Sequence, residues 1–277
     1  MASTSKIFVA ALNVTASPHP EGTYRRLLEA AANHEIHLTG HDFAKLTPPD
    51  IPGKDQNIVT GRICVWTEIE KKEDWFNKKT NAAATDKDKE SIVIPDILAP
   101  NFKYFLYAMD LARHVIVFEA KNEVRSSFNP KRARKFFDDL LNSLGGDFPD
   151  VDVTVIPEEG SVEKILSLPR LRRLKIVVTR PNGEDLTDEF AAVMAEMNEE
   201  NAKMLTRELV KAPKTEALKP NETTRKLAMI ASTNGYVEGK GSEGGDSTRE
   251  HAKVVPVEVA ADGSQIVRFV QSLLHFK

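Results

Sequence analysis

Short apolar runs bounded by turn-forming residues recur along this chain, and they constrain its fold more than any other feature. Runs of this length and composition are typical of β-strands. The runs at residues 101–110 and 113–121 are separated by only a short turn, which predicts a hairpin. The predicted strands cover residues 6–14, 35–43, 57–70, 101–110, 113–121, 151–157, 173–181, 224–232, 235–241 and 253–261.

Longer stretches place apolar residues three or four positions apart, as one face of a helix requires. They predict helices at residues 20–34, 129–146 and 182–205, and a short helix at residues 161–168. In the second of these, Asn129 is a suitable N-cap and Pro130 occupies the first helical position. Because several strands follow one another directly, the sequence predicts an α+β fold with mainly antiparallel mixed sheets and packed helices.

The chain of 277 residues is long enough for two units of ordinary size. The segment DFPDVD at residues 147–152 has the composition of a linker, and it predicts two sub-domains, residues 1–148 and 149–277. A polar stretch at residues 71–90 predicts a mobile excursion, with Trp75 and Phe76 fixing one end.

The net charge of −3 gives no overall indication of a nucleic-acid partner, so any such indication has to be local. The single cysteine, Cys64, excludes a disulfide within the chain and fits a reducing compartment. No apolar stretch approaches the roughly 20 residues needed to cross a bilayer. The sequence therefore predicts a cytoplasmic protein that has no membrane partner.

One predicted strand carries an unusual concentration of positive charge. Residues 168–183 (LPRLRRLKIVVTRPNG) contain five cations and no acid. Because side chains alternate along a strand, Leu174, Ile176 and Val178 would face the core. Arg173 and Lys175 would then project together on the opposite side. The basic residues of this segment are Arg170, Arg172, Arg173, Lys175 and Arg180.

A second group of cations lies around the start of the predicted helix at residues 129–146. The first turn of a helix carries the positive end of the backbone dipole, where acids are preferred. Cations at this position lower stability unless an anion binds, and the unpaired N–H groups of the same turn suit a phosphate. The residues are Arg125, Lys131, Arg132, Arg134 and Lys135.

Two interpretations of these cations remain open. They could contact a nucleic-acid backbone together, which would make binding strongly dependent on salt. Alternatively, they could pair within the chain, since residues 183–200 follow directly and contain seven acids and no base. The candidate nucleic-acid-binding residues are Arg125, Lys131, Arg132, Lys135, Arg170, Arg172, Arg173, Lys175 and Arg180.

A catalytic alternative comes from residues 93–96 (VIPD) and 115–121 (VIVFEAK). Together they give Pro-Asp followed by Glu-x-Lys at the end of an apolar strand, a combination that restriction-type nucleases use. Two carboxylates, Asp96 and Glu119, would hold Mg²⁺, and Lys121 would help to position the attacking water. The spacing is loose, so simple binding without a catalytic centre is the preferred interpretation.

Other chemical sites have weaker support. His34, His37 and His41 lie close together with Asp42, but in a strand only His37 and His41 share a face, so we predict no metal site. The chain has no GxSxG, P-loop, GxGxxG after a strand or paired CxxC motif. We therefore expect no cofactor.

Residues 118–130 (FEAKNEVRSSFNP), 151–186 and 234–241 (NGYVEGKG) resemble an uncharacterised bacterial family. The TRPN step at 179–182 and the NGYV step at 234–237 carry most of the likeness, which extends over nearly the whole chain. The family is a domain of unknown function of about this length, found in bacterial and prophage genomes. The layout of the second half is also loosely similar to phage-exclusion DNA-binding proteins such as RexA, an analogy of layout alone.

The resemblance adds to the local charge pattern and favours a nucleic-acid-binding protein of phage-defence or toxin-like type. Such a protein would bind DNA rather than RNA, form a homodimer and act through an effector protein. The alternatives are the metal-dependent nuclease and a homo-oligomeric protein-interaction module.

Overall fold

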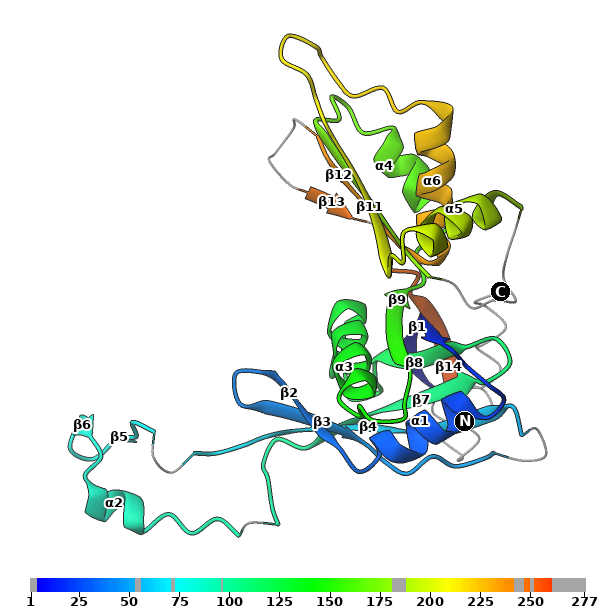
Figure 1. The fold of residues 1–277 in the computed structure, drawn as a ribbon. Helices are drawn as coiled ribbons and strands as arrows, with labels where there is room; N and C mark the ends of the chain where they lie inside the picture. Colours follow the sequence, from blue (N-terminus) through cyan, green and yellow to red (C-terminus); the bar gives the residue numbers. More distant parts are fainter. Residues whose placement is uncertain are drawn as a thin grey trace.

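The computed structural model describes residues 4–52, 56–70, 73–95, 97–180, 188–241, 247–249 and 252–260. These residues form two units, each with a sheet and helices, and the strands pair antiparallel throughout (Figure 1). The structure confirms the predicted α+β fold with mainly antiparallel sheets. Among the described residues, none of the helices combines the length and hydropathy needed to cross a membrane.

The larger sheet has eight strands, and β1 lies one strand in from one of its edges. One side of β1 pairs with β8, and the other side pairs with β14 along its first half and β9 along its second. Beyond β8 the order continues β7-β4-β3-β2. The strands are β1 (Thr4–Ser17), β2 (Glu35–Thr39), β3 (Asp42–Leu46), β4 (Ile58–Thr67), β7 (Lys103–Asp110), β8 (Val115–Lys121), β9 (Asp150–Val155) and β14 (Val255–Ala260).

Helices α1 (Thr23–Ala31) and α3 (Pro130–Asn142) lie on one face of this sheet. The predicted capping of α3 is confirmed, because the Asn129 side chain accepts a hydrogen bond from the Arg132 N–H at 2.9 Å. At its other end, the Asn142 side chain exchanges two hydrogen bonds with the Val151 backbone and fixes α3 against β9. The buried stripe of α3 is Ala133, Phe136, Phe137, Leu140 and Leu141.

The smaller sheet has the order β11-β10-β12-β13. Helices pack on only one of its faces (Figure 1). Leu174, Ile176 and Val178 of β10 point into this helical side and are buried, as the alternation predicts. The elements are β10 (Arg173–Thr179), β11 (Met204–Val210), β12 (Gly235–Lys240) and β13 (Ser247–Arg249), with α4 (Ser161–Leu166), α5 (Asp188–Glu199) and α6 (Glu222–Thr233).

The two units meet where the chain leaves β9 and returns to β14. An isolated bridge pairs Pro157 with Ala252, so both crossings lie side by side. Asn13 of β1 also donates a hydrogen bond to the Asn234 side chain, 2.9 Å away, at the end of α6. The predicted boundary at residue 148 precedes both β9 and β14, which nevertheless complete the larger sheet by pairing with β1.

Between β4 and β7 the chain forms an arm that extends away from both sheets (Figure 1). It carries the short strands β5 (Phe76–Asn77) and β6 (Ala82–Ala83) and the one-turn helix α2 (Asp86–Glu90). Thr85 and Asp88 form a reciprocal capping box at the start of α2. Local hydrogen bonds therefore order the arm, although it packs little apolar surface.

Three element predictions were wrong. Residues 35–43, predicted as one strand, form β2 and the start of β3, which pair antiparallel across the turn at Gly40. Residues 224–232, predicted as a strand, belong to α6, because Asn221 caps the helix by accepting the Thr224 N–H and Leu227, Ala228 and Ala231 form a buried helical stripe. The predicted helix at 182–205 ends earlier, because α5 stops at Glu199 and β11 begins at Met204. Exposure alternates residue by residue along β11, as in an edge strand whose two faces differ.

Candidate functional site

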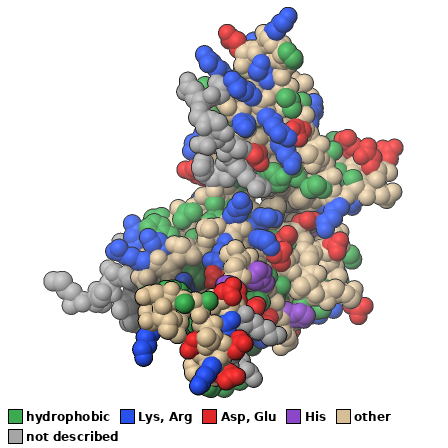
Figure 2. All heavy atoms as spheres, turned by 90° about the vertical axis from the view of Figure 1, so that its left-hand side faces the viewer, with side chains coloured by type: hydrophobic (Ala, Val, Ile, Leu, Met, Phe, Trp, Pro, Cys, Tyr) green, Lys and Arg blue, Asp and Glu red, His purple; other side chains and the backbone are tan. Residues whose placement is uncertain are grey.

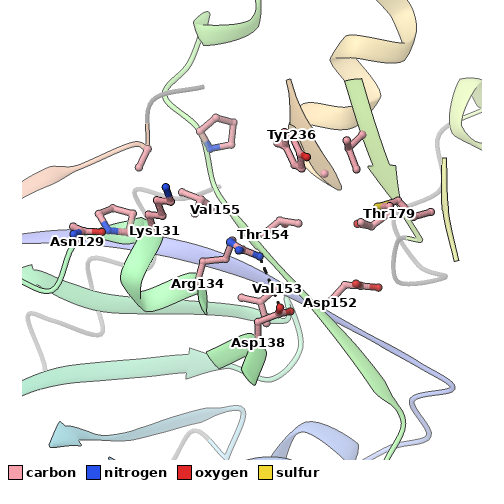
Figure 3. A pocket seen from close by; sticks show the side chains of 16 residues that line it. Asn129, Lys131, Arg134, Asp138, Asp152, Val153, Thr154, Val155, Thr179 and Tyr236 are labelled. Carbon is pink, nitrogen blue, oxygen red and sulfur yellow. Dashed lines mark ion pairs between the residues drawn. The ribbon is translucent and has the colours of Figure 1, made fainter. Parts of the chain in front are cut away.

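A cleft of about 430 Å³ lies between the two units (Figure 3). One wall comes from the first turns of α3 and from β9, and the other from the ends of β10, β11 and β12. Lys131 and Arg134 contribute cations to it, Asp152 an acid, and Tyr236 an aromatic ring. Apolar walls with a few charged groups are the usual composition of a binding site for a small ligand or for part of a larger one.

The face of the smaller sheet that no helix covers leads into this cleft. In the strand register, Val177 lies opposite Tyr236 on β12 and Thr206 on β11, so these side chains share the uncovered face. Lys175 is the next β10 residue on that face, and its ammonium nitrogen lies 5.8 Å from the centre of the Tyr236 ring. We call this surface the open face.

Cations lie along the open face and at its junction with α3. Figure 2, viewed from that side, shows Lys and Arg side chains over the smaller unit and a further group between the units. Lys131 is exposed on the first turn of α3 and lines the cleft. Lys175, 44 positions from Lys131 in the sequence, contacts Tyr236, which lines the cleft together with Lys131.

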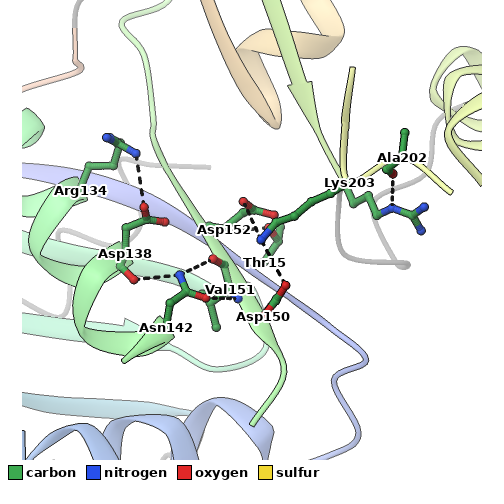
Figure 4. A network of polar contacts seen from close by, with 10 residues as sticks. Thr15, Arg134, Asp138, Asn142, Asp150, Val151, Asp152, Ala202 and Lys203 are labelled. Atoms are coloured by element: carbon green, nitrogen blue, oxygen red, sulfur yellow. Dashed lines mark hydrogen bonds and ion pairs between the residues drawn. The ribbon is translucent and has the colours of Figure 1, made fainter. Parts of the chain in front are cut away.

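The end of the cleft that lies away from Lys131 carries aspartates (Figure 4). Burial raises the pKa of Asp138, and the Arg134 guanidinium, 3.8 Å away, opposes this shift. Burial also raises the pKa of Asp152, while Lys203 opposes it. The Lys203 ammonium lies 3.4 Å from an Asp150 carboxylate oxygen and 4.0 Å from one of Asp152, so it links β11 to β9 across the units.

Several predicted binding residues are already bound within the chain. The Arg132 guanidinium contacts Asp42 at 2.7 Å, and this hydrogen bond lowers the pKa of the Asp42 carboxyl. Lys135 pairs with Asp139 one turn along α3. Arg173 pairs with Glu208 on β11, and that contact raises the pKa of Arg173.

Arg180 is also bound, but to neutral groups. Its guanidinium donates to the carbonyl oxygens of Ala202 and Met197, at 2.9 and 3.2 Å, and to the Asn198 side chain at 2.8 Å. It therefore closes the end of α5, where carbonyl groups lack helical partners. This role is structural and leaves little of the guanidinium for an external anion.

The remaining predicted cations make no ion pair within the part of the chain that the structure describes. Arg170 and Arg172 are exposed just before β10, and Arg125 is exposed in the loop before α3. Arg173 pairs with β11, so the acidic helix α5 does not supply its partner. The predicted cations without such a pair are Arg125, Lys131, Arg170, Arg172 and Lys175, and the strand register places Lys175 between Glu208 and Glu238.

The nuclease residues do not gather in an accessible site among the described residues. The Glu119 side chain is 4% exposed and accepts a hydrogen bond from the Leu106 N–H at 2.8 Å, where β7 and β8 cease to pair. Burial raises its pKa to about 7. Lys121 lies 5.8 Å from the Phe8 ring, and Asp96 lies outside the described residues.

The described residues contain no group of three or more His, Cys, Asp or Glu side chains that could hold a metal ion. His41 instead lies 3.3 Å from Glu73, and the His37 ring lies 2.6 Å from the Gly40 carbonyl oxygen in the β2–β3 turn. Cys64 is partly buried in β4, and burial raises the pKa of its thiol.

Sequence reasoning missed Tyr236, Asp138 and Asp152 as residues of the site. Each is unremarkable in its own segment, because a lone tyrosine in a strand or an aspartate in a helix is common. Tyr236 becomes informative only once β12 is paired with β10. The signal that was available is the predicted alternation of β10, which correctly put Lys175 on the side opposite the core.

The model of one protein family, described as a domain of unknown function, DUF4747, matches residues 5–273. A search of curated proteins finds no match to the chain.

Proposed function

Because this chain belongs to the DUF4747 family, whose description states no activity, we propose from the site itself that it binds nucleic acid. The observation that carries this proposal is that Lys131 lines an interdomain cleft together with Tyr236, whose ring lies 5.8 Å from the Lys175 ammonium nitrogen. Phosphate groups would contact these two lysines, with Arg170 and Arg172 extending the path at the end of β10 that lies away from the cleft.

The position of Lys131 supports a phosphate contact. It stands on the first turn of α3, where the helix dipole is positive and no acid is present. A cation at this position adds to the positive potential of the helix N-terminus. An anion bound there would neutralise that potential and stabilise the helix. DNA is the expected partner, in a cytoplasmic, defence-associated role that an effector protein completes, as the layout analogy suggests.

We expect fluorescence anisotropy to show binding of labelled DNA at low salt, with affinity falling steeply as salt rises, because phosphate contacts release counterions. Lys131→Glu and Lys175→Glu should each lower affinity on the order of tenfold and reduce the salt slope by about one. RNA of the same sequence, measured in parallel, tests the preference for DNA.

Lys226→Glu is the matched control for these substitutions. Lys226 is an exposed lysine on α6, where it pairs with Glu222, and α6 packs on the helical side of the smaller sheet. Its reversal should leave binding unchanged. The proposal is wrong if neither DNA nor RNA binds at low salt, or if all three reversals have the same effect.

A second function, self-association, is favoured by the arm between β4 and β7. Large apolar side chains on it face solvent, and an apolar surface of this kind on a soluble protein usually marks an interaction site. A second copy of the chain would cover them and give the predicted homodimer. The side chains and their exposed fractions are Phe76 62%, Val93 84%, Ile97 91%, Leu98 62% and Phe102 61%.

Size-exclusion chromatography with light scattering is expected to give the mass of a dimer for the wild type. Ile97→Asp combined with Leu98→Asp should give a monomer, because each change places a charge in the apolar surface. Val124→Asp is the control, since Val124 is 79% exposed but lies outside the arm. A wild-type protein that remains a monomer at high concentration contradicts this function.

A further inference from the structure

We propose that the cleft accepts one unpaired nucleotide of a single-stranded nucleic acid, with its base between the apolar walls and its phosphate at Lys131. This inference rests on the proposed function and narrows its ligand from nucleic acid in general to strands with unpaired bases.

The size and the apolar walls of the cleft suit an unpaired base. Its volume of about 430 Å³ lies in the range of sites that enclose a small ligand. Val155, Val177 and Met204 supply apolar surface from three strands, and Tyr236 adds an aromatic ring. The bases of a duplex are stacked and paired inside the helix, so they cannot enter an apolar cleft. An unpaired base can enter it, stack on an aromatic side chain and be shielded from water.

The charges at the two ends of the cleft determine how a nucleotide would be oriented in it. In Figure 3, Lys131 lies toward one end and Asp152 toward the other. A phosphate is attracted to Lys131 and to the N-terminus of α3, and it is repelled by the carboxylate of Asp152, whereas Asp138 is paired with Arg134. A base, in contrast, carries N–H donors that a carboxylate can accept. The charges therefore orient a nucleotide with its phosphate at α3 and its base toward the acids.

The open face gives the rest of the strand a path out of the cleft. Lys175 lies over the Tyr236 ring, and Arg173, though paired with Glu208, follows on the same face of β10. A strand whose base occupies the cleft can thus place its next phosphate at Lys175, the cation of this face that is not paired with Glu208. Contacts of this kind tolerate any sequence, because every base has an aromatic face.

The test compares an oligothymidine strand with its duplex and with an oligouridine strand, by fluorescence anisotropy on the full chain. We expect the single strands to bind more tightly than the duplex. Tyr236→Leu should lower single-strand affinity about tenfold and leave duplex affinity unchanged, because it removes stacking but keeps apolar bulk. Tyr236→Phe keeps the ring and should restore single-strand binding.

A second variant guards against misfolding of the Tyr236 substitutions. Met204 is 53% exposed and lines the cleft, so Met204→Glu should place a repulsive charge beside the ligand without disturbing the core. Met229→Glu is its matched control, because Met229 is 47% exposed on α6, away from the cleft. Only the Met204 substitution should weaken single-strand binding.

The outcomes separate this inference from the proposed function. If Tyr236→Leu and Met204→Glu bind single strands like the wild type while Lys131→Glu does not, the cleft is no base site and the phosphate surface stands. If the wild type binds no nucleic acid, both proposals fall. If thymidine monophosphate displaces the strand at an equal concentration of nucleotide, the ligand is a free nucleotide and the strand proposal is overturned.

Discussion

Replacing Gly235 with alanine is expected to destabilise the protein by at least about 3 kcal/mol. Gly235 begins β12 with a φ of +151°, a conformation that L side chains rarely adopt. A Cβ atom at this position would lie 1.9 Å from the Val177 carbonyl oxygen and 2.9 Å from its carbonyl carbon. These are backbone atoms of the neighbouring strand β10, so they cannot move aside without separating the two strands.

Urea denaturation followed by circular dichroism measures this effect. Gly40→Ala is the matched control, because Gly40 also has a positive φ, +59°, but a Cβ there meets nothing within 4 Å. It should cost only about 1 kcal/mol from backbone strain. Equal losses for the two variants would show that close packing of β12 on β10 does not restrict position 235.

Glu119→Gln should stabilise the protein above neutral pH by roughly 3 kcal/mol at most. The folded protein raises the pKa of Glu119 to about 7 from its usual 4.5, so the folded state holds its proton more tightly than the unfolded state. The wild type is thus relatively most stable below pH 4.5 and loses stability as the pH rises to about 7. Glutamine stays neutral and can still accept the Leu106 N–H, so the variant lacks this loss.

The measurement is the free energy of unfolding of both proteins across this pH range. Their difference should be small at acidic pH and should reach its full value above pH 7, since other titrating groups contribute equally to both. Glu29→Gln, at an exposed position of α1, is the control and should show no such pH-dependent difference. A variant that is less stable than the wild type at every pH would mean that the carboxylate is favourably bound.

The fold could be predicted from sequence wherever local signals agree. For α3, the N-cap Asn129, Pro130 and the apolar stripe all indicate one helix, and the structure has it at Pro130–Asn142. For α6 they disagree, because the run LAMIA is apolar enough for a buried strand and the cap at Asn221 lies three residues before the predicted segment. Tertiary packing of α6 on β10 and β12 decides between the two.

The site was less predictable, since it depends on contacts between distant segments. The alternation along β10 indicates which side chains share a face, and this was sufficient to place Lys175. It does not indicate that β9 leaves the second half of the chain to pair with β1, which brings Asp152 and α3 against the smaller sheet. Internal partners such as Asp42 for Arg132, 90 positions away, are equally invisible in the sequence.

Because Pro157 pairs with Ala252, the smaller unit is an insertion into the connection between β9 and β14 of the larger unit. The chain of the larger sheet is interrupted between β9 and β14, yet both strands pair with β1. Excising the residues between these two points and closing the gap with a short turn would leave the strand order of the larger sheet unaltered. This deletion would remove one wall of the cleft. The shortened chain should therefore fold but no longer bind an unpaired base.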